Sequence, residues 1–283
     1  MDGRATESVT MSSADPNEPR FWRDAALPFV EARSIRDGRH VCYGKHAHET
    51  FSIGFVTHGR CTYLNGRTRQ PIRAGTVVLM NPGDVHACNP SHDEPWSYCM
   101  FYLDVAWLTG IQQELGVSPN GSFRPFSATA STQPGLYARM RHLHRVLTDQ
   151  HADSLTKHSA VLTTMTVVQQ TLGSPLRPLQ LRNPRLERAA QFIRDNCAQP
   201  LKMDDICSAA DLSPSYLIRA FKDRYGLTPH AYLTNCRVEF SRSELRRGRP
   251  IAEVANAAGF CDQAHMQRSF KKLVAATPGQ YRT

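Results

Sequence analysis

Two kinds of spacing between hydrophobic positions divide this chain of 283 residues. From about residue 41 to 104 the apolar residues form short runs rich in β-branched and aromatic side chains, which is typical of strands. Asn65-Gly66 predicts a type I′ hairpin between two runs, and NPGD at 81–84 predicts a second turn. Several short strands at close spacing favour a small barrel or sandwich. The predicted strands are 51–57, 61–64, 67–70, 75–80 and 96–103.

From residue 134 to about 172 the spacing lengthens to that of helices. A break at Asp153-Ser154 predicts that two helices form a hairpin. A surface helix buries one face, so an apolar stripe on it is either intrachain core or a seam between two copies of the chain. The stripes consist of Leu136, Met140, Leu143 and Leu147 in the first helix, and Leu155, Leu162, Met165 and Val168 in the second.

Segments without such spacing mark the domain limits. Residues 1–20 are polar with two prolines, which predicts a disordered tail. Residues 173–184 contain three prolines and no clear periodicity, which predicts an interdomain linker. Between and after these segments we expect a barrel domain at 21–133, the helical hairpin at 134–172 and a C-terminal helical domain at 185–283.

Composition narrows the class of protein. Hydrophobic residues make up 41% of the chain and the mean hydropathy is −0.43, as in soluble globular proteins. The longest apolar run, at 75–80, is far shorter than the roughly 20 residues that cross a bilayer, and the N-terminus lacks a signal-peptide pattern. We therefore expect a cytoplasmic protein without a membrane partner. Eight scattered cysteines with no CxxC pair argue against a disulfide framework and a zinc ribbon.

The positive charge is concentrated near the C-terminus. The net charge is +9, and the segment from Arg185 onward holds 16 basic against 10 acidic residues, an excess of six. This excess is compatible with binding a polyanion such as nucleic acid, and equally with an ordinary solvated surface.

An internal repeat lies in this basic segment. MDDICSAADL at 203–212 aligns with IAEVANAAGF at 251–260, and after one extra residue the alignment continues at an offset of 49. Each copy has a short helix, a tight turn and a second helix that begins after its own cap, Ser213 or Asp262. This is the anatomy of a helix-turn-helix, whose second helix enters the major groove of DNA. A solenoid-type α-hairpin repeat is the alternative, but only two copies are present.

A longer helix is predicted between the copies, from Thr228-Pro229 to about Arg247. About 19 residues at roughly 1.5 Å each give about 28 Å, comparable with the roughly 34 Å helical repeat of DNA. We therefore expect the two recognition helices to enter successive major grooves of one duplex.

These residues resemble a known family. Residues 185–282 are similar to the DNA-binding domain of AraC/XylS-type transcription regulators, and the stretch GFCDQAHMQRSFKKLVAATPGQYR resembles the family's signature. The resemblance implies double-stranded DNA and RNA polymerase as partners. It also implies a homodimer with contacts after the barrel, which we expect at the first apolar stripe. The base-reading residues it implies are Ser215, Ile218, Arg219, Gln263, Ala264, His265, Gln267 and Arg268, of which Ile218 and Ala264 depart from the polar residues often found there. Lys222 and Lys271, three residues after the arginine in each second helix of the repeat, are further DNA-binding candidates.

Three histidines are candidate binding residues in the barrel. His46 and His48 in KHAHET stand two apart, which on a strand places both imidazoles on one face, and His86 follows the NPGD turn. These runs resemble the two motifs of a cupin barrel, the usual sensory domain of AraC-type regulators. A cupin enzyme would hold a metal such as Fe(II) with these histidines and a carboxylate. Here Glu49 follows His48 directly and is expected on the opposite face, so we expect a polar organic effector and neither a metal nor another cofactor.

The sequence therefore predicts an α+β protein of two domains: a cupin-like barrel with a helical hairpin, and an all-α domain with two helix-turn-helix units. Its predicted function is a sequence-specific transcription regulator whose barrel senses a small-molecule effector. We expect no enzymatic activity, because no Ser/His/Asp motif, phosphate-binding glycine motif or HExxH is present. A metal-dependent cupin enzyme fused to a DNA-binding domain is the main alternative, and a nucleoid-type structural DNA binder is a third.

Overall fold

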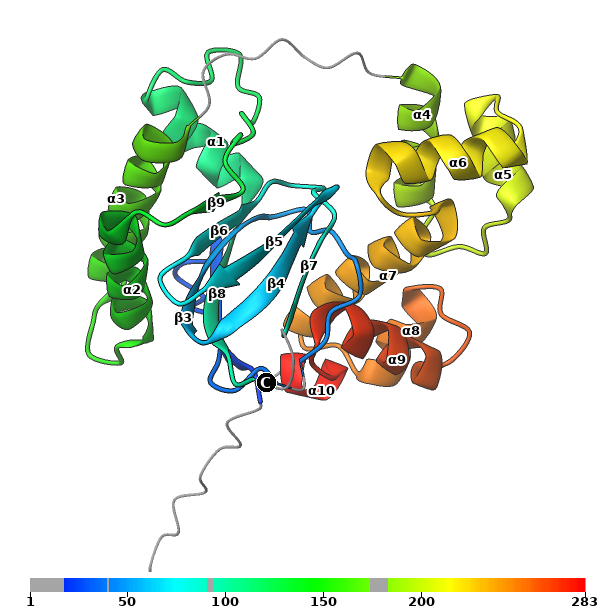
Figure 1. Cartoon of the computed structure of the whole chain (residues 1–283). Coiled ribbons are helices and arrows are strands. Elements are labelled where there is room, and N and C mark those ends of the chain that lie inside the picture. Colours follow the sequence, from blue (N-terminus) through cyan, green and yellow to red (C-terminus); the bar gives the residue numbers. More distant parts are fainter. Residues whose placement is uncertain (1–17, 40, 91–93, 174–182, 283) are drawn as a thin grey trace, which may run out of the picture.

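Nine strands form two antiparallel sheets in the part of the chain that the computed structural model describes, residues 18–39, 41–90, 94–173 and 183–282. The larger sheet has the order β1 (Arg20–Trp22), β2 (Val30–Ile35), β8 (Ser97–Leu103), β3 (Phe51–His58), β6 (Val77–Met80) and β9 (Ala130–Ser131). The smaller sheet has the order β5 (Thr68–Arg73), β4 (Arg60–Asn65) and β7 (His86–Pro90). The two sheets pack face to face as a small barrel (Figure 1).

The predicted strands are confirmed as β3, β4, β5, β6 and β8, with ends that agree to within three residues. The hairpin between β4 and β5 is present, but its turn differs from the prediction. Asn65 pairs with Thr68, so the two loop residues are Gly66 and Arg67. Gly66 has a φ of 58° and Arg67 does not have a positive φ, which fits glycine at the first position of a type II′ turn. The sequence missed β1, β2, β7, β9 and helix α1 (Val105–Glu114).

The predicted helical hairpin is formed by α2 (Pro134–Thr148) and α3 (Ser154–Leu172). Together with α1 these helices cover one side of the larger sheet (Figure 1). Leu136, Met140, Leu143 and Leu147 of α2 are all buried, in one core with β3 residues such as Phe51. This stripe is therefore intrachain core, and the prediction that it forms a dimer contact is wrong.

The stripe predicted for the second helix is also partly wrong. Met165 and Val168 are buried as expected, but Leu155 and Leu162 are 75% and 38% exposed. Val161 occupies the buried position instead, so the face of α3 that packs is rotated from the predicted one. The predicted linker falls mainly on residues 174–182 and the predicted tail on residues 1–17, which lie outside the described residues.

Seven helices make up the C-terminal domain within the described residues. They pack into two hydrophobic cores, one around Phe221 and one around Phe270. The domain lies on the side of the barrel away from α1–α3 (Figure 1). This confirms the predicted α+β architecture with two domains. The helices are α4 (Pro184–Asp195), α5 (Met203–Ala210), α6 (Pro214–Tyr225), α7 (Pro229–Arg246), α8 (Ile251–Ala257), α9 (Gln263–Val274) and α10 (Pro278–Arg282).

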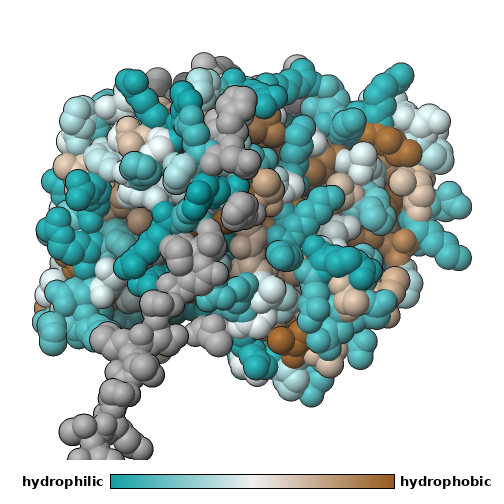
Figure 2. Space-filling view, turned by 60° about the horizontal axis from the view of Figure 1, so that its bottom comes forward, coloured by the Kyte–Doolittle hydropathy of each residue, from teal (hydrophilic) through white to brown (hydrophobic). Residues whose placement is uncertain are grey.

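The surface view in Figure 2 is mostly hydrophilic, with separate hydrophobic patches on the side of the C-terminal domain. No helix in the described ranges is both long and apolar enough to cross a membrane.

Candidate functional site

The repeat folds as two helix-turn-helix units, α5–α6 and α8–α9. In the first unit Ile206, Leu217 and Phe221 share one core, and in the second Val254, Met266 and Phe270 share the other. The turns differ by the extra residue seen in the sequence. Asp211 takes the left-handed conformation in the first turn and Gly259 in the second, where a β-carbon would stand only 2.6 Å from the carbonyl oxygen of Ala198.

The second helix of each unit, α6 or α9, presents most of the DNA-binding candidates to solvent. His265 is the exception, since it is half-buried with its ring edge-on to Phe260 at 5.2 Å, while its backbone N–H is capped by Asp262. Tyr216 was not among the sequence candidates, yet its side chain is 40% exposed in the first turn of α6. The exposed candidates are Ser215, Ile218, Arg219, Lys222, Gln263, Ala264, Gln267, Arg268 and Lys271.

Helix α7 joins the two units, as predicted, and is capped by the Thr228 hydroxyl, which accepts from the N–H of Ala231 at 3.2 Å. Leu233 near its start belongs to the first core, and Val238 and Leu245 belong to the second. Its 18 residues span about 27 Å at about 1.5 Å per residue. The helix therefore fixes the spacing of the two recognition helices.

His46, His48 and His86 converge in the barrel, and all three are buried. Their ring centroids lie 4.4 to 5.0 Å apart, and one ring nitrogen from each lies within 4.8 Å of the others. His46 is not part of a long strand: it forms an isolated bridge in which its N–H and carbonyl pair with those of His86. Glu49 is exposed, whereas the three histidines are buried.

Burial and mutual proximity keep the histidine cluster uncharged. Burial lowers the pKa of His86 to about 3, with a further contribution from His48. Burial also lowers the pKa of His46, which is next to both other rings, and that of His48, although Glu239 opposes the last shift. At neutral pH the cluster therefore offers neutral imidazoles with nitrogen lone pairs.

A cavity of about 40 Å³ adjoins the three imidazoles. At about 10–15 Å³ for each water centre, it has room for roughly three waters. Its walls are mainly aromatic, with Phe55, Trp96, Tyr98 and Tyr102 among them. The arrangement suits a small occupant held by imidazole nitrogens inside an apolar pocket.

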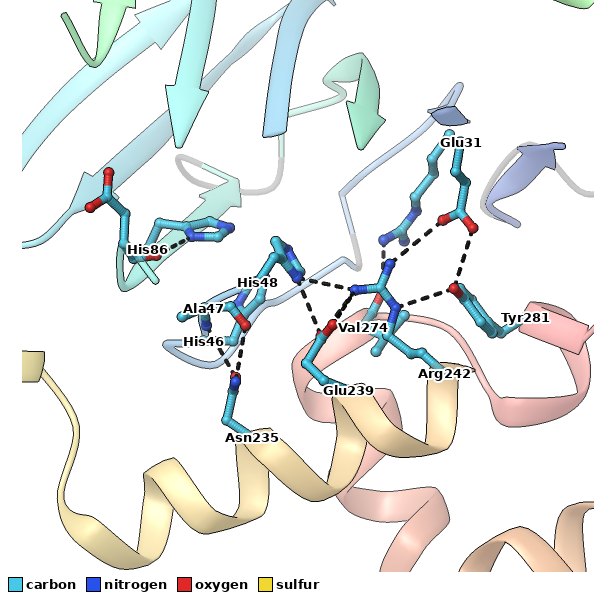
Figure 3. A network of polar contacts seen from close by, with 12 residues as sticks. Glu31, His46, Ala47, His48, His86, Asn235, Glu239, Arg242, Val274 and Tyr281 are labelled. Atoms are coloured by element: carbon cyan, nitrogen blue, oxygen red, sulfur yellow. Dashed lines mark hydrogen bonds and ion pairs between the residues drawn. The ribbon is translucent and has the colours of Figure 1, made fainter. Parts of the chain in front are cut away.

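The C-terminal helical domain forms one side of this histidine site, which the sequence did not indicate. Three polar residues of α7, Asn235, Glu239 and Arg242, face the segment that carries His46 and His48 (Figure 3). The Glu239 carboxylate lies 3.4 Å from His48 Nδ1, and Arg242 Nη1 lies 3.1 Å from the same nitrogen. These three residues are spaced so that they share one face of α7, but the sequence does not show whether that face is solvated or packed.

A second set of contacts joins β2 to the end of the chain. The Glu31 carboxylate accepts from Arg23 Nε at 2.7 Å and from the Tyr281 hydroxyl at 3.3 Å, and Arg242 approaches it at 3.6 Å. Arg33, fully buried, donates to the carbonyl oxygen of Val274 at 2.7 Å, at the carboxyl end of α9. A cation at this end of a helix is favoured by the helix dipole. The second recognition helix is thus anchored to the barrel.

Comparison with known proteins identifies both domains. Residues 28–165 match the AraC-like ligand binding domain family, and residues 206–283 match a helix-turn-helix domain family. The two architectures together define a ligand-binding transcription regulator. The chain belongs to the AraC family of transcription regulators.

Several characterised proteins are similar over most of the chain. The raffinose operon transcriptional regulatory protein RafR of Pediococcus pentosaceus is 21% identical over 98% of this chain and 96% of its own length. The arabinose operon regulatory protein of Salmonella typhimurium is 26% identical over 82% of this chain and 83% of its own. An apo form of ToxT from Vibrio cholerae superposes with a TM-score of 0.58 at 14% identity, over 93% of this chain and 96% of ToxT, which shows a shared fold.

Proposed function

We propose that this protein regulates transcription by binding specific DNA sequences through α6 and α9, under the control of a small ligand held by His46, His48 and His86. The observation that carries the proposal is the placement of α7: the helix that spaces the two recognition helices also packs against the histidine site through Asn235 and Glu239. A ligand that moves the histidines therefore acts directly on the element that sets the geometry of DNA binding.

The DNA-contacting residues follow from exposure and chemistry. Arg219 and Arg268 are exposed on the two recognition helices and are suited to bidentate contacts with guanine. Lys222 and Lys271, one turn further along, are suited to phosphates. Ser215, Gln263 and Gln267 offer hydrogen bonds to base edges, while Ile218 and Ala264 offer apolar contact to a thymine methyl group. His265 contributes chiefly to the packing of the α8–α9 turn.

The wider role is inferred from the family and from the relatives. RafR and the arabinose regulator are named for operons of sugar metabolism, and one ToxT structure contains an unsaturated fatty acid. We infer a regulator that acts on the DNA of the cell's cytoplasm, contacts RNA polymerase at its promoters and has no enzymatic activity. We also retain a homodimer as part of the proposal, with its contact outside the buried α2 stripe.

Selection of binding sites from a random pool of duplexes by the purified full chain tests this function. We expect a discrete operator whose two halves are about one helical turn apart, since α7 spaces the two helices accordingly. The affinity should fall with salt with a log–log slope of about −0.9 per phosphate contacted. Equal affinity for the selected duplex and for random duplexes at all salt concentrations would contradict the proposal.

A further inference from the structure

Two cysteines meet on neighbouring strands of the smaller sheet. Cys61 of β4 is opposite Pro90 of β7, and Cys88 of β7 is opposite Tyr63 of β4. Opposite residues of an antiparallel pair point to the same face, and so do residues two apart along one strand. Cys61 and Cys88 are therefore diagonal neighbours on one face of the sheet, and their Sγ atoms lie 3.1 Å apart.

The two sulfurs are close enough to become bonded with little movement. A disulfide bond is about 2.05 Å long, so each sulfur needs to move by only about 0.5 Å toward the other. Both residues are free thiols in this structure. Cys61 is fully buried, whereas Cys88 is half-buried, so an oxidant reaches the pair from the side of Cys88.

Cys88 is also part of the wall of the histidine cavity. It follows His86 by two residues on β7, so the two side chains share a face, and both line the cavity together with His46. The cavity of about 40 Å³ has room for roughly three waters, which is enough for hydrogen peroxide with its two oxygen atoms. The Cys88 thiol therefore borders the cavity on one side and Cys61 on the other.

Two of the imidazoles can hold a peroxide beside this thiol. His46 Nδ1 lies 2.7 Å from the carbonyl oxygen of Gly44, and His86 Nδ1 lies 2.8 Å from that of Asp84. A carbonyl oxygen can only accept, so each Nδ1 carries the proton and the lone pair of each neutral ring is on Nε2. The Nε2 atoms of His46 and His86 can therefore accept hydrogen bonds from the O–H groups of a hydroperoxide.

We propose that Cys61 and Cys88 form a reversible disulfide when a hydroperoxide enters the histidine cavity, and that this oxidation is the signal that the barrel senses. The proposal rests on the proposed sensory role of this pocket and names the class of its effector. That effector is a small oxidant, in place of the polar organic effector expected from the sequence. A disulfide in a reducing compartment is usually transient and redox-sensing, which fits a regulatory bond.

The reaction takes two steps. In the first, Cys88 Sγ attacks one peroxide oxygen, the O–O bond breaks, and the thiol proton leaves with the other oxygen as water. In the second, Cys61 Sγ attacks the sulfur of the Cys88 sulfenic acid, the S–O bond breaks, and the departing hydroxyl takes the Cys61 proton as a second water. The two cysteines lose two electrons in total, and these electrons reduce the peroxide.

The surroundings of the pair select for an oxidant inside the cavity. The contact with Cys61 and burial raise the pKa of the Cys88 thiol well above its ordinary value. Since the thiolate is the stronger nucleophile, the reduced pair resists oxidants that meet it only by collision. A peroxide held next to the sulfur reacts at a high effective concentration. Bulky oxidants such as glutathione disulfide do not fit the cavity, so we expect a response to small hydroperoxides only.

Strand β7 connects the thiol pair to the C-terminal domain. Just before the strand, Val85 packs against Leu227, which lies between α6 and α7. His86 pairs through its backbone N–H and carbonyl with His46. A disulfide draws Cys88 toward β4 and so shifts the strand that carries both contacts. Oxidation therefore changes how the junction of α6 and α7 sits on the barrel, and with it the binding of the operator.

The test uses the full chain, reduced, freed of reductant and then treated with hydrogen peroxide. We expect a cross-link between Cys61 and Cys88 in peptide mass spectra, the loss of two free thiols, and reversal of both by dithiothreitol. Glutathione disulfide at the same concentration should not produce the cross-link. Cys61→Ala should leave Cys88 as a sulfenic acid that reacts with dimedone. Cys42→Ala, which changes an exposed cysteine, is the control and should form the cross-link like the parent.

Operator binding is measured on the same samples. We expect the affinity of the parent and of Cys42→Ala to change at least about fivefold on oxidation, the lower end of typical allosteric coupling, and that of Cys61→Ala to stay constant. A folded parent that forms no Cys61–Cys88 cross-link with peroxide overturns the proposal, and so does a cross-linked parent with unchanged operator affinity. Equally rapid cross-linking by glutathione disulfide overturns the role of the cavity.

The outcomes separate the thiol pair from the regulatory function. The measurements on the parent need no variant, so a Cys61→Ala protein that fails to fold does not leave the proposal untested. Specific binding of the selected operator without disulfide formation refutes only the oxidant-sensing pair. Disulfide formation in a protein that binds no specific DNA in either redox state refutes the proposed function.

Discussion

Asn235 of α7 pairs with the backbone of Ala47 through two hydrogen bonds. Its amide oxygen accepts from the N–H of Ala47 and its amide nitrogen donates to the carbonyl of Ala47, both at 3.0 Å (Figure 3). Ala47 lies between His46 and His48, and both partners are buried. The Asn235 side chain thus satisfies the backbone N–H and carbonyl of Ala47, as a neighbouring strand would in a sheet.

Replacement of this amide should weaken the contact between the domains. Asn235→Ala leaves the N–H and carbonyl of Ala47 buried without partners, at a cost of about 1–3 kcal/mol for each group. We expect a lower midpoint of urea unfolding and faster proteolysis between the domains. His230→Ala, at an exposed position of the same helix, serves as the control and should change neither. A stable Asn235→Ala protein with unchanged proteolysis would show that the domains do not depend on this contact.

Two neighbouring cations of α9 should differ in their effect on DNA binding. Arg268→Ala should cost about 1–3 kcal/mol on the selected operator and relax preference at one or two base pairs, as expected for loss of a guanine contact. Lys271→Ala should weaken binding to all sequences alike and lower the salt slope by about one. Binding competitions with single-base variants of the operator measure both effects. If Arg268→Ala weakens all duplexes equally, this arginine contacts phosphate.

The helix-turn-helix units and the central strands could be predicted from sequence because local pattern determines them. Small residues, caps and turn residues recur in both copies of the repeat, and each copy buries its own apolar face. Strand β2 was missed for a physical reason: Glu31 and Arg33 interrupt its apolar pattern. Both side chains can be buried because the C-terminal domain supplies their partners: Arg242 forms an ion pair with Glu31, and the carbonyl of Val274 accepts from Arg33. These partners are far away in the sequence, so the local pattern around β2 could not reveal them.

The histidine site was only half predictable for the same reason. The spacing placed His46 and His48 on one face, and the resemblance to the two cupin motifs implied that His86 joins them. The carboxylate beside them was sought within a few residues of His48, but Glu239 comes from a helix 191 residues further along. Likewise, the α2 stripe is compatible with a dimer seam or with intrachain core, and only the placement of α2 on the sheet decides between them.

Truncation of the α2 stripe should affect stability and leave the oligomeric state unchanged. Leu143 is 1% exposed in the core beneath the larger sheet, so Leu143→Ala should destabilise the protein by about 2–5 kcal/mol. Leu155→Ala on α3, where the side chain is 75% exposed, should be nearly neutral. Urea unfolding gives the stabilities and sedimentation gives the mass. If the parent is a dimer and Leu143→Ala makes it a monomer without lowering its stability, the α2 stripe is a dimer contact after all.

The ion cluster at Glu31 should make stability depend on pH in the acid range. Burial alone would raise the pKa of Glu31, but Arg242, Arg23 and Arg246 together outweigh burial, so its pKa in the folded protein is below the ordinary value. Tyr281 also faces the carboxylate, and its hydroxyl donates to it. A lowered pKa means that the folded state favours the ionised form. The stabilisation is therefore complete above the unfolded pKa of about 4.3 and is lost as the pH falls through the folded value.

Glu31→Gln should remove this contribution at neutral pH and not at low pH. We expect a loss of about 1.5–3 kcal/mol at pH 7, the scale of hydrogen bonds to a charged group. The difference between variant and parent should shrink as the pH falls below about 4, where the parent carboxylate becomes protonated too. Glu253→Gln provides the control, because that carboxylate is 61% exposed and its ion pair with Arg249 contributes little. Urea unfolding of the three proteins between pH 7 and pH 3 measures the effect. If Glu31→Gln lowers the free energy of unfolding by the same amount at every pH, the charge of Glu31 does not stabilise the junction between β2, α7 and α10.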